Sequence, residues 1–338
     1  AMQGIPLEAL PSVRESYLRQ LEDHCRRAKE KGAALVLSGE SLWNFDRSAL
    51  LWLRDFLAGH SFEVEVIGYV RPRKARMESV FYQRLKAGGG SDLNSYIHQD
   101  GPLRYRERLE ALDAVFGKGQ VGIRLFHRDS LEQGCVVKDF CTQTGIEVSD
   151  SRFVRYNESL RLPAVRLLYA LRRFGGVPPL REGMVQRRYY GVAQKLSCLT
   201  GPPVRFHSEL VAPFLALYEA EHPWLEERLG FSLREDIHRD DDGPCIRSEA
   251  DLFDFDPESL EWLAEQTGGK PVRPTRDEAA ARAVAAQVRL LDKRWSSQHA
   301  PPRSQFPENV RRWFRTLFRA GVRPDADNHR REAKQPDA

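Results

Sequence analysis

An arginine and a serine in the segment from residue 69 to residue 83 have the types and spacing to bind an anion. Arg71 ends an apolar run typical of a strand, Pro72 turns the chain, and Ser79 lies about two helical turns further on. The carboxyl ends of strands line the ligand crevice of an open parallel sheet, so both side chains are expected there. A guanidinium binds phosphate through two parallel hydrogen bonds, and a serine hydroxyl adds a donor. The pair therefore suits a terminal phosphate monoester.

The same residues have a simpler interpretation, which is a solvated charge followed by an ordinary helical serine. Arg73, Lys74 and Arg76 lie in the same segment, and cations on the first turn of a helix are common at protein surfaces. We retain only Arg73 of these three, as a secondary phosphate contact.

Glu40 directly follows another apolar stretch, and its carboxylate is expected to face the same crevice as Arg71. Ser38 and Ser41 flank it, and their hydroxyls could hydrogen-bond a donor or an acceptor molecule. A glutamate in this position is also typical of a plain loop or a helix start, so both interpretations stand. The histidines show no repeated ligand spacing, and the sequence predicts no metal site.

The elements that must position these residues follow from hydrophobic periodicity. Short apolar runs bounded by turn residues predict strands at 33–38, 63–70 and 121–126. Asp46 can cap a helix between the first two strands, so 33–70 has the order of a βαβ unit. Further helices are expected at 12–31, 74–86, 102–116 and 136–144. The predicted fold class is α/β, a parallel sheet flanked by helices with a largely helical C-terminal half.

Composition limits the class of protein. A chain of 338 residues with 41% hydrophobic content can bury a full core. Its 52 Lys and Arg against 48 Asp and Glu give a net charge of +4, too small to indicate nucleic-acid binding by itself. The five cysteines are widely spaced without a CxxC pair, which disfavours a disulfide framework and a zinc site. No signal-peptide pattern or apolar run long enough for a membrane span is present, so a cytoplasmic location is predicted.

Two charged stretches invite other functions. Asp240, Asp241 and Asp242 lack a regular metal-binding loop, so we expect solvent-exposed carboxylates and no bound ion. An arginine-rich stretch at 311–319 could contact nucleic acid, but its interleaved aromatic and leucine residues favour a packed amphipathic helix.

A strand-end arginine, a nearby proline and a serine eight residues later together resemble the 3'-phosphate-binding motif of sulfotransferases. The segments 35–42, 69–88, 121–146 and 157–160 follow in the order seen in bacterial polysaccharide-type members, and 222–230 is similar to a closing helix of that group. The resemblance covers roughly residues 30 to 235. It implies a P-loop nucleotide hydrolase-like sulfotransferase fold that uses 3'-phosphoadenosine-5'-phosphosulfate (PAPS) as co-substrate.

The resemblance also implies residue roles and an activity. Arg71 and Ser79, with Arg73 beside them, would bind the 3'-phosphate of PAPS, and Glu40 would act as general base. Ser38 and Ser41 would bind substrate. The reaction would transfer a sulfuryl group to a hydroxyl of a carbohydrate or of a cell-envelope glycan precursor.

The sequence departs from the sulfotransferase pattern at one point, and this leaves two interpretations. The Lys-Thr-Gly-Thr-Thr-like loop that holds the 5'-phosphosulfate in these enzymes is not found in the sequence. The sequence is then expected to be either an N-terminally incomplete sulfotransferase or an inactive homologue that serves as a nucleotide- or glycan-binding module. Both alternatives stay open.

The domain prediction follows the extent of the resemblance. A sulfotransferase-like α/β domain is expected at 1–235, a helical extension at 236–321 and a disordered tail at 322–338. The expected partner is the hydroxyl-bearing acceptor, with no nucleic acid and no integral membrane association. The sequence does not predict an oligomeric state.

Overall fold

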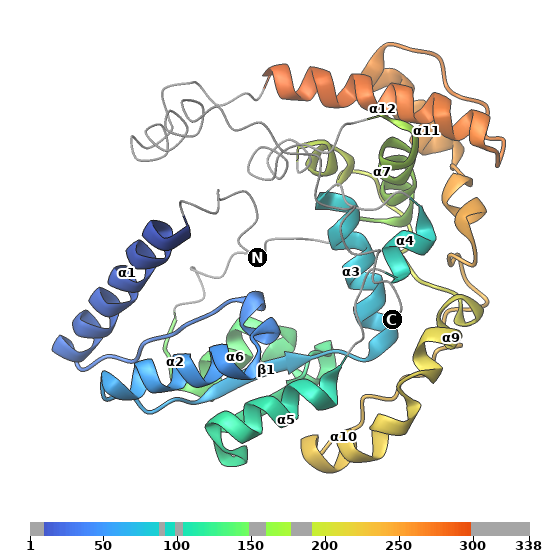
Figure 1. Cartoon of the computed structure of the whole chain (residues 1–338). Helices are drawn as coiled ribbons and strands as arrows, with labels where there is room; N and C mark the ends of the chain where they lie inside the picture. Colours follow the sequence, from blue (N-terminus) through green and yellow to red (C-terminus); the bar gives the residue numbers. More distant parts are fainter. Residues whose placement is uncertain (1–9, 88–91, 99–103, 149–159, 177–190, 299–338) are drawn as a thin grey trace, which may run out of the picture. The chain divides into compact units, whose positions relative to one another are not determined.

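The computed structural model describes residues 10–87, 92–98, 104–148, 160–176 and 191–298, drawn as helices, strands and coil in Figure 1. Backbone contacts divide the chain into two units, 1–295 and 296–338.

A two-stranded parallel sheet positions the segment that contains Arg71. Strand β1 (Val66–Val70) pairs with β2 (Val121–Leu125), with Val66 opposite Val121 and Val70 opposite Leu125. Parallel strands need a long crossover, and here it runs through α3 (Arg73–Ala87), α4 (Leu93–His98), α5 (Tyr105–Phe116) and the 3₁₀ turn η3 (Lys118–Gln120). The predicted mixture of helices with a parallel sheet is confirmed, in a chain that is mostly helical.

The strand predicted at 33–38 is wrong, because residues 33–39 form no regular secondary structure. Val36 and Leu37 are 48% and 37% exposed, so this apolar run is not buried as a central strand would be. Strand formation needs a partner for the backbone N–H and C=O groups, and among the described residues β1 pairs only with β2. The next strand begins at Val66 rather than at residue 63.

The two faces of the sheet have different neighbours because successive side chains alternate between them. Val70 and Ile123 pack with residues of α5, and Val121 packs with Leu50 of α2 (Arg47–Gly59). The opposite face carries polar residues that hold the next helix in place, as described below. The sheet is thus sandwiched between helices on both sides (Figure 1).

On that opposite face, Tyr69 and Arg124 lie directly across from each other. The Tyr69 hydroxyl donates to Oδ2 of Asp139 at 2.8 Å, and Arg124 donates two hydrogen bonds to the same carboxylate at 2.7 and 2.9 Å. Asp139 lies in α6 (Val136–Thr144) and is 1% exposed. This network therefore fixes α6 on the sheet.

The remaining elements are short connectors and helices. Asp46 caps α2 by accepting a hydrogen bond from the backbone N–H of Ala49 at 2.8 Å, as predicted. The 3₁₀ helices are η2 (Glu40–Asn44), η4 (Arg128–Ser130), η5 (Glu132–Gly134), η7 (Glu219–Glu221) and η8 (Glu249–Phe253). The other α-helices are α1 (Leu10–Glu30), α7 (Leu162–Phe174), α9 (Ser208–Ala216), α10 (His222–Leu229), α11 (Pro257–Thr267) and α12 (Glu278–Gln298).

The largest hydrophobic core surrounds α7, whose residues are buried on nearly every side. It joins Phe81 of α3 and Tyr96 of α4 to Leu263 of α11 and Val288 of α12. Residues on both sides of position 236 therefore share one core. The domain boundaries themselves stay predictions, and the tail predicted at 322–338 lies outside the described residues.

Helix α3 connects this core to the sheet. Its first turn lies beside Tyr105 at the end of the sheet, since the Arg73 guanidinium is 5.3 Å from that ring. Further along, Met77, Phe81 and Leu85 enter the large core. The polar residues of the 71–79 segment are consequently held between two packed regions.

Candidate functional site

Arg71 lies where the sequence placed it, directly after β1. Its guanidinium covers the ring of Phe126, with Cζ 4.0 Å from the ring centroid. Phe126 follows β2 and donates its backbone N–H to the carbonyl oxygen of Val70 at 2.7 Å. The Tyr105 hydroxyl donates to the carbonyl oxygen of Arg71 at 2.9 Å. The ends of both strands and the start of α5 thus fix a half-buried arginine at the sheet edge.

Ser79 lies in α3, the helix that follows Arg71, and its side chain is half-buried. The strand-to-helix arrangement of the predicted pair is therefore present. That both side chains converge on one phosphate stays a prediction.

Arg73, the predicted secondary phosphate contact, is 2% exposed and already ion-paired. Its Nη2 donates to Glu221, and its Nη1 lies 3.4 Å from Nε2 of His222. The guanidinium also lies 4.8 Å from the ring of Tyr218. Burial lowers the pKa of Arg73, although the carboxylate of Glu221 opposes that shift. The charge of Arg73 is thus matched within the protein.

Lys74 is also a buried cation rather than a surface one, with 3% exposure. Its Nζ donates to the carbonyl oxygen of Ile237 at 2.7 Å and lies 3.4 Å from Oδ2 of Asp240. The backbone N–H groups of Lys74 and Ala75 donate to Glu235. A protein carboxylate therefore occupies the amino end of α3, where the helix dipole favours negative charge.

Glu78 continues this polar layer between α3 and the later chain. Its carboxylate accepts the backbone N–H of Phe206 at 2.9 Å and lies 3.4 Å from Nη1 of Arg205. Burial raises the pKa of Glu78 to about 7, although the Phe206 N–H and the charges of Arg205 and Lys74 act in the other direction. Sequence patterning gave no sign of this residue, because a single helical glutamate carries no motif.

Arg76 is more exposed than its neighbours Arg73 and Lys74. It is half-buried, and its Nε, like that of Arg73, is buried without a hydrogen-bond acceptor. Within the described part of the chain, no carboxylate lies within ion-pair distance of Arg76. Burial raises the pKa of Tyr105 to about 12, against the charges of Arg76, Arg73 and Arg71. Three guanidinium groups thus act on one phenol.

The predicted catalytic and substrate-binding residues lie in and before η2. Glu40 and Ser41 begin this 3₁₀ helix, but their side chains are outside the described part. Ser38 precedes it in the extended segment and is exposed. A general base at Glu40 and substrate binding by the two serines stay predictions.

The acidic turn at 240–242 is less exposed than predicted. The side chains of Asp240 and Asp241 are only 32% and 17% exposed, so the prediction of solvent-exposed carboxylates is wrong for these two. Ser208 donates to Asp241 through its backbone N–H at 2.8 Å and its hydroxyl at 2.6 Å. A segment distant in sequence supplies these donors, which sequence spacing could not reveal. Asp242 is exposed as expected.

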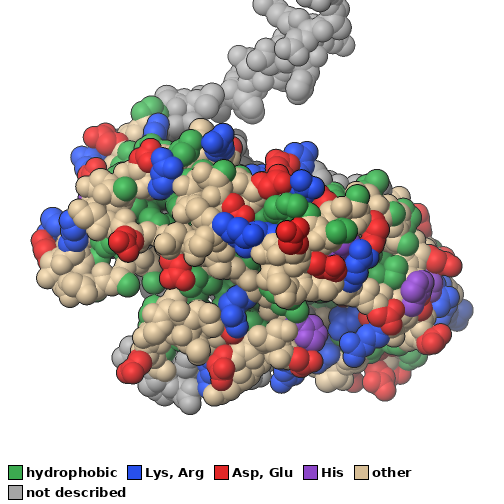
Figure 2. Space-filling model, turned by 90° about the horizontal axis from the view of Figure 1, so that it is seen from below, with side chains coloured by type: hydrophobic (Ala, Val, Ile, Leu, Met, Phe, Trp, Pro, Cys, Tyr) green, Lys and Arg blue, Asp and Glu red, His purple; other side chains and the backbone are tan. Residues whose placement is uncertain are grey.

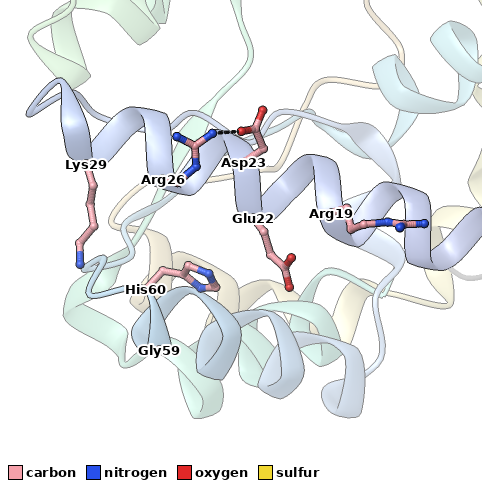
Figure 3. A pocket seen from close by; sticks show the side chains of 7 residues that line it. All are labelled: Arg19, Glu22, Asp23, Arg26, Lys29, Gly59 and His60. Carbon is pink, nitrogen blue, oxygen red and sulfur yellow. Dashed lines mark hydrogen bonds and ion pairs between the residues drawn. The ribbon is translucent and has the colours of Figure 1, made fainter.

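Within the described residues, neither a metal-ligand cluster nor the hollow beside α1 forms a competing site. The described residues contain no group of three or more His, Cys, Asp or Glu residues arranged to hold a metal ion. Figure 3 shows an open hollow between α1 and the end of α2, where Gly59 and His60 face charged side chains of α1. Several of those side chains, such as Arg26 and Asp23, pair with each other along the helix. This hollow therefore has the character of a solvated helix surface.

On the surface seen in Figure 2, positive and negative side chains are interspersed. This distribution on that face agrees with the small net charge of the chain. None of the described helices combines the length and apolar composition needed to cross a membrane.

Comparison with known proteins adds no relative: no protein-family model, no curated protein and no solved structure matches this chain.

Proposed function

We propose that this chain is a sulfotransferase-like protein that binds the 3'-phosphate of PAPS at Arg71 and Ser79. It would transfer the sulfuryl group to a hydroxyl of a carbohydrate or of a cell-envelope glycan precursor. The observation that carries the proposal is the position of Arg71, a half-buried arginine at the carboxyl end of a parallel strand pair. Such strand ends are where open α/β sheets bind their ligands.

The contacts of Arg71 suit this role. A guanidinium whose face lies over an aromatic ring still presents N–H donors along its edge. Because the Tyr105 hydroxyl holds the Arg71 carbonyl oxygen, the backbone at this point is fixed before a ligand arrives. The Phe126 ring, 4.0 Å from Cζ of Arg71, also limits the positions of the guanidinium, and groups that are already ordered cost less entropy when a phosphate binds.

In the proposed reaction, Glu40 takes the proton of the acceptor hydroxyl as that oxygen attacks sulfur in line. The new S–O bond forms while the bond between sulfur and the 5'-phosphate oxygen breaks, which leaves adenosine 3',5'-bisphosphate. Ser38 and Ser41 would hydrogen-bond the donor or the acceptor.

A second candidate function is binding of a nucleotide or glycan without transfer. It is favoured by one feature of residues 1–338, which contain no Lys-Thr-Gly-Thr-Thr-like loop for the phosphosulfate. The two candidates share the 3'-phosphate site and differ in catalysis. A transfer assay with PAPS and a panel of glycans, run on the wild type and Glu40→Gln, separates them.

Calorimetry with adenosine 3',5'-bisphosphate and adenosine 5'-monophosphate tests the shared site. Removing a charge-assisted contact costs on the order of 1.5 to 3 kcal/mol, so Arg71→Ala should weaken bisphosphate binding roughly tenfold to a hundredfold. Ser79→Ala should lose less, and Arg14→Ala, at an exposed position in α1, is the matched control. Circular dichroism reports whether each variant folds. A wild type without preference for the bisphosphate, or an Arg71→Ala variant that keeps the preference, would refute the proposal.

A further inference from the structure

We propose that Arg76 is a second guanidinium of the anion site, acting beside Arg71 on a doubly charged phosphate monoester. This inference rests on the proposed function for the identity of the ligand. It rests on the contacts of α3 for the identity of the residue.

The cations of α3 differ in whether a carboxylate of the protein lies close to them. Arg73 pairs with Glu221, and Lys74 lies near Asp240 and donates to a backbone carbonyl. Both are almost completely buried. Arg76 belongs to the same helix, yet within the described residues no carboxylate lies within ion-pair distance of it.

Arg76 also has an unsatisfied donor. Its Nε is buried and has no acceptor, as is also true of Arg73, but Arg73 has Glu221 to match its charge and Arg76 has no such carboxylate among the described residues. A buried donor without a partner is costly, and most such groups in folded proteins are hydrogen-bonded. An anion bound at the half-buried guanidinium of Arg76 would supply the negative charge that no carboxylate of the described residues provides.

Arg76 lies between Arg73 and Ser79 on the surface of α3, because residues three apart on a helix are surface neighbours. Arg73 covers the Tyr105 ring, and the Tyr105 hydroxyl holds the Arg71 carbonyl oxygen. Arg76 therefore lies on the part of α3 that connects the predicted hydroxyl ligand with the strand end.

The charge of such a site selects its ligand. Two guanidiniums favour a dianion over a monoanion, because each positive charge interacts with each negative charge. The amino end of α3 is taken by Glu235, so the side chains must provide the attraction. A phosphate monoester is mostly doubly charged at neutral pH, and it fits this requirement better than a carboxylate ligand does.

The test uses the folded chain with three probes: adenosine 3',5'-bisphosphate, adenosine 5'-monophosphate and inorganic pyrophosphate. Calorimetry should show bisphosphate binding weakened roughly tenfold in Arg76→Met, which keeps the apolar stem but removes the charge. Arg76→Ala checks that the loss does not depend on the replacement, and Arg14→Ala is the control. The double variant Arg71→Ala/Arg76→Met should lose less than the product of the two single losses, because both groups bind one phosphate.

The outcomes separate this inference from the proposed function. If both Arg76 variants fold and bind all three probes like the wild type, the inference is refuted, even where Arg71→Ala abolishes the bisphosphate preference. If Arg76→Met weakens pyrophosphate binding but the wild type has no bisphosphate preference, the anion site stands and the nucleotide assignment falls. A wild type that binds none of the probes refutes both.

Discussion

Replacing Glu78 by glutamine should make the stability of this protein less sensitive to pH. The Glu78 carboxylate accepts the backbone N–H of Phe206 and pairs with Arg205. Its burial raises its pKa from 4.5 to about 7. Glutamine keeps an oxygen that can accept the Phe206 N–H, and it removes the titrating charge. The charged groups that face this carboxyl are Lys74 of the same helix, Arg205 and Asp240.

The direction in which stability changes with pH follows from where Glu78 binds its proton more tightly. A carboxyl with a higher pKa in the folded state binds its proton more tightly there than in the unfolded chain. The stability that the proton contributes is therefore complete below the unfolded pKa and is lost as pH rises through the folded pKa. One pKa unit corresponds to about 1.4 kcal/mol, so the shift of Glu78 corresponds to on the order of 3 kcal/mol. Most of this difference should develop between pH 5 and pH 8.

Urea unfolding at pH 5 and pH 8 measures the effect. The free energy of unfolding of Glu78→Gln minus that of the wild type should become more favourable by on the order of 2 to 3 kcal/mol from the lower to the higher pH. Glu261→Gln, at an exposed position in α11, controls for the loss of one negative charge. A difference that stays constant with pH, or that moves against the variant as pH rises, would refute the reasoning. Either result would mean that Arg205 and Lys74 stabilise an ionised Glu78.

Two further predictions concern the sheet. Asp139→Asn should lower the free energy of unfolding by roughly 1.5 to 3 kcal/mol, because it removes the negative charge to which Arg124 donates two hydrogen bonds. Urea unfolding checks this, and an equal loss in the exposed control Asp129→Asn would contradict it. Gly68→Ala should cost about 1 kcal/mol, since a Cβ there would lie 2.8 Å from Cδ1 of Ile123. Ile123→Val removes that Cδ1, so the double variant should be more stable than the sum of the single effects predicts, and an additive result would exclude this steric account.

Local patterns in the sequence predicted the elements that local interactions stabilise. The parallel strands β1 and β2 and the helix at 136–144 were found because their hydrophobic periodicity and turn residues agree with their environment. The segment 33–38 has the composition of a strand, but it pairs with no strand in the part of the chain that the structure describes. Strand formation depends on a partner elsewhere in the chain, so composition alone could not decide it.

The candidate site shows the same limit at the level of single residues. The sequence predicted the position of Arg71 after β1, because the strand and Pro72 determine it locally. It retained Arg73 and not Arg76 as a phosphate contact, because the partners that bury Arg73 and Lys74, Glu221 and Ile237, lie about 150 residues or more away in sequence. Long-range ion pairing therefore decided which cations are structural.

The contacts at the start of α3 determine what kind of anion site residues 71–79 can form. A helix amino end with free N–H groups binds phosphate through its backbone and dipole, but Glu235 already accepts those donors at the start of α3. An anion at this sheet edge must then be held by side chains, through the guanidiniums of Arg71 and Arg76 and the Ser79 hydroxyl. Side-chain binding of this kind depends strongly on those few residues, because no backbone cradle remains to compensate for their loss. A single arginine substitution in the proposed 3'-phosphate site should accordingly weaken phosphate binding at least about tenfold without unfolding the helix α3.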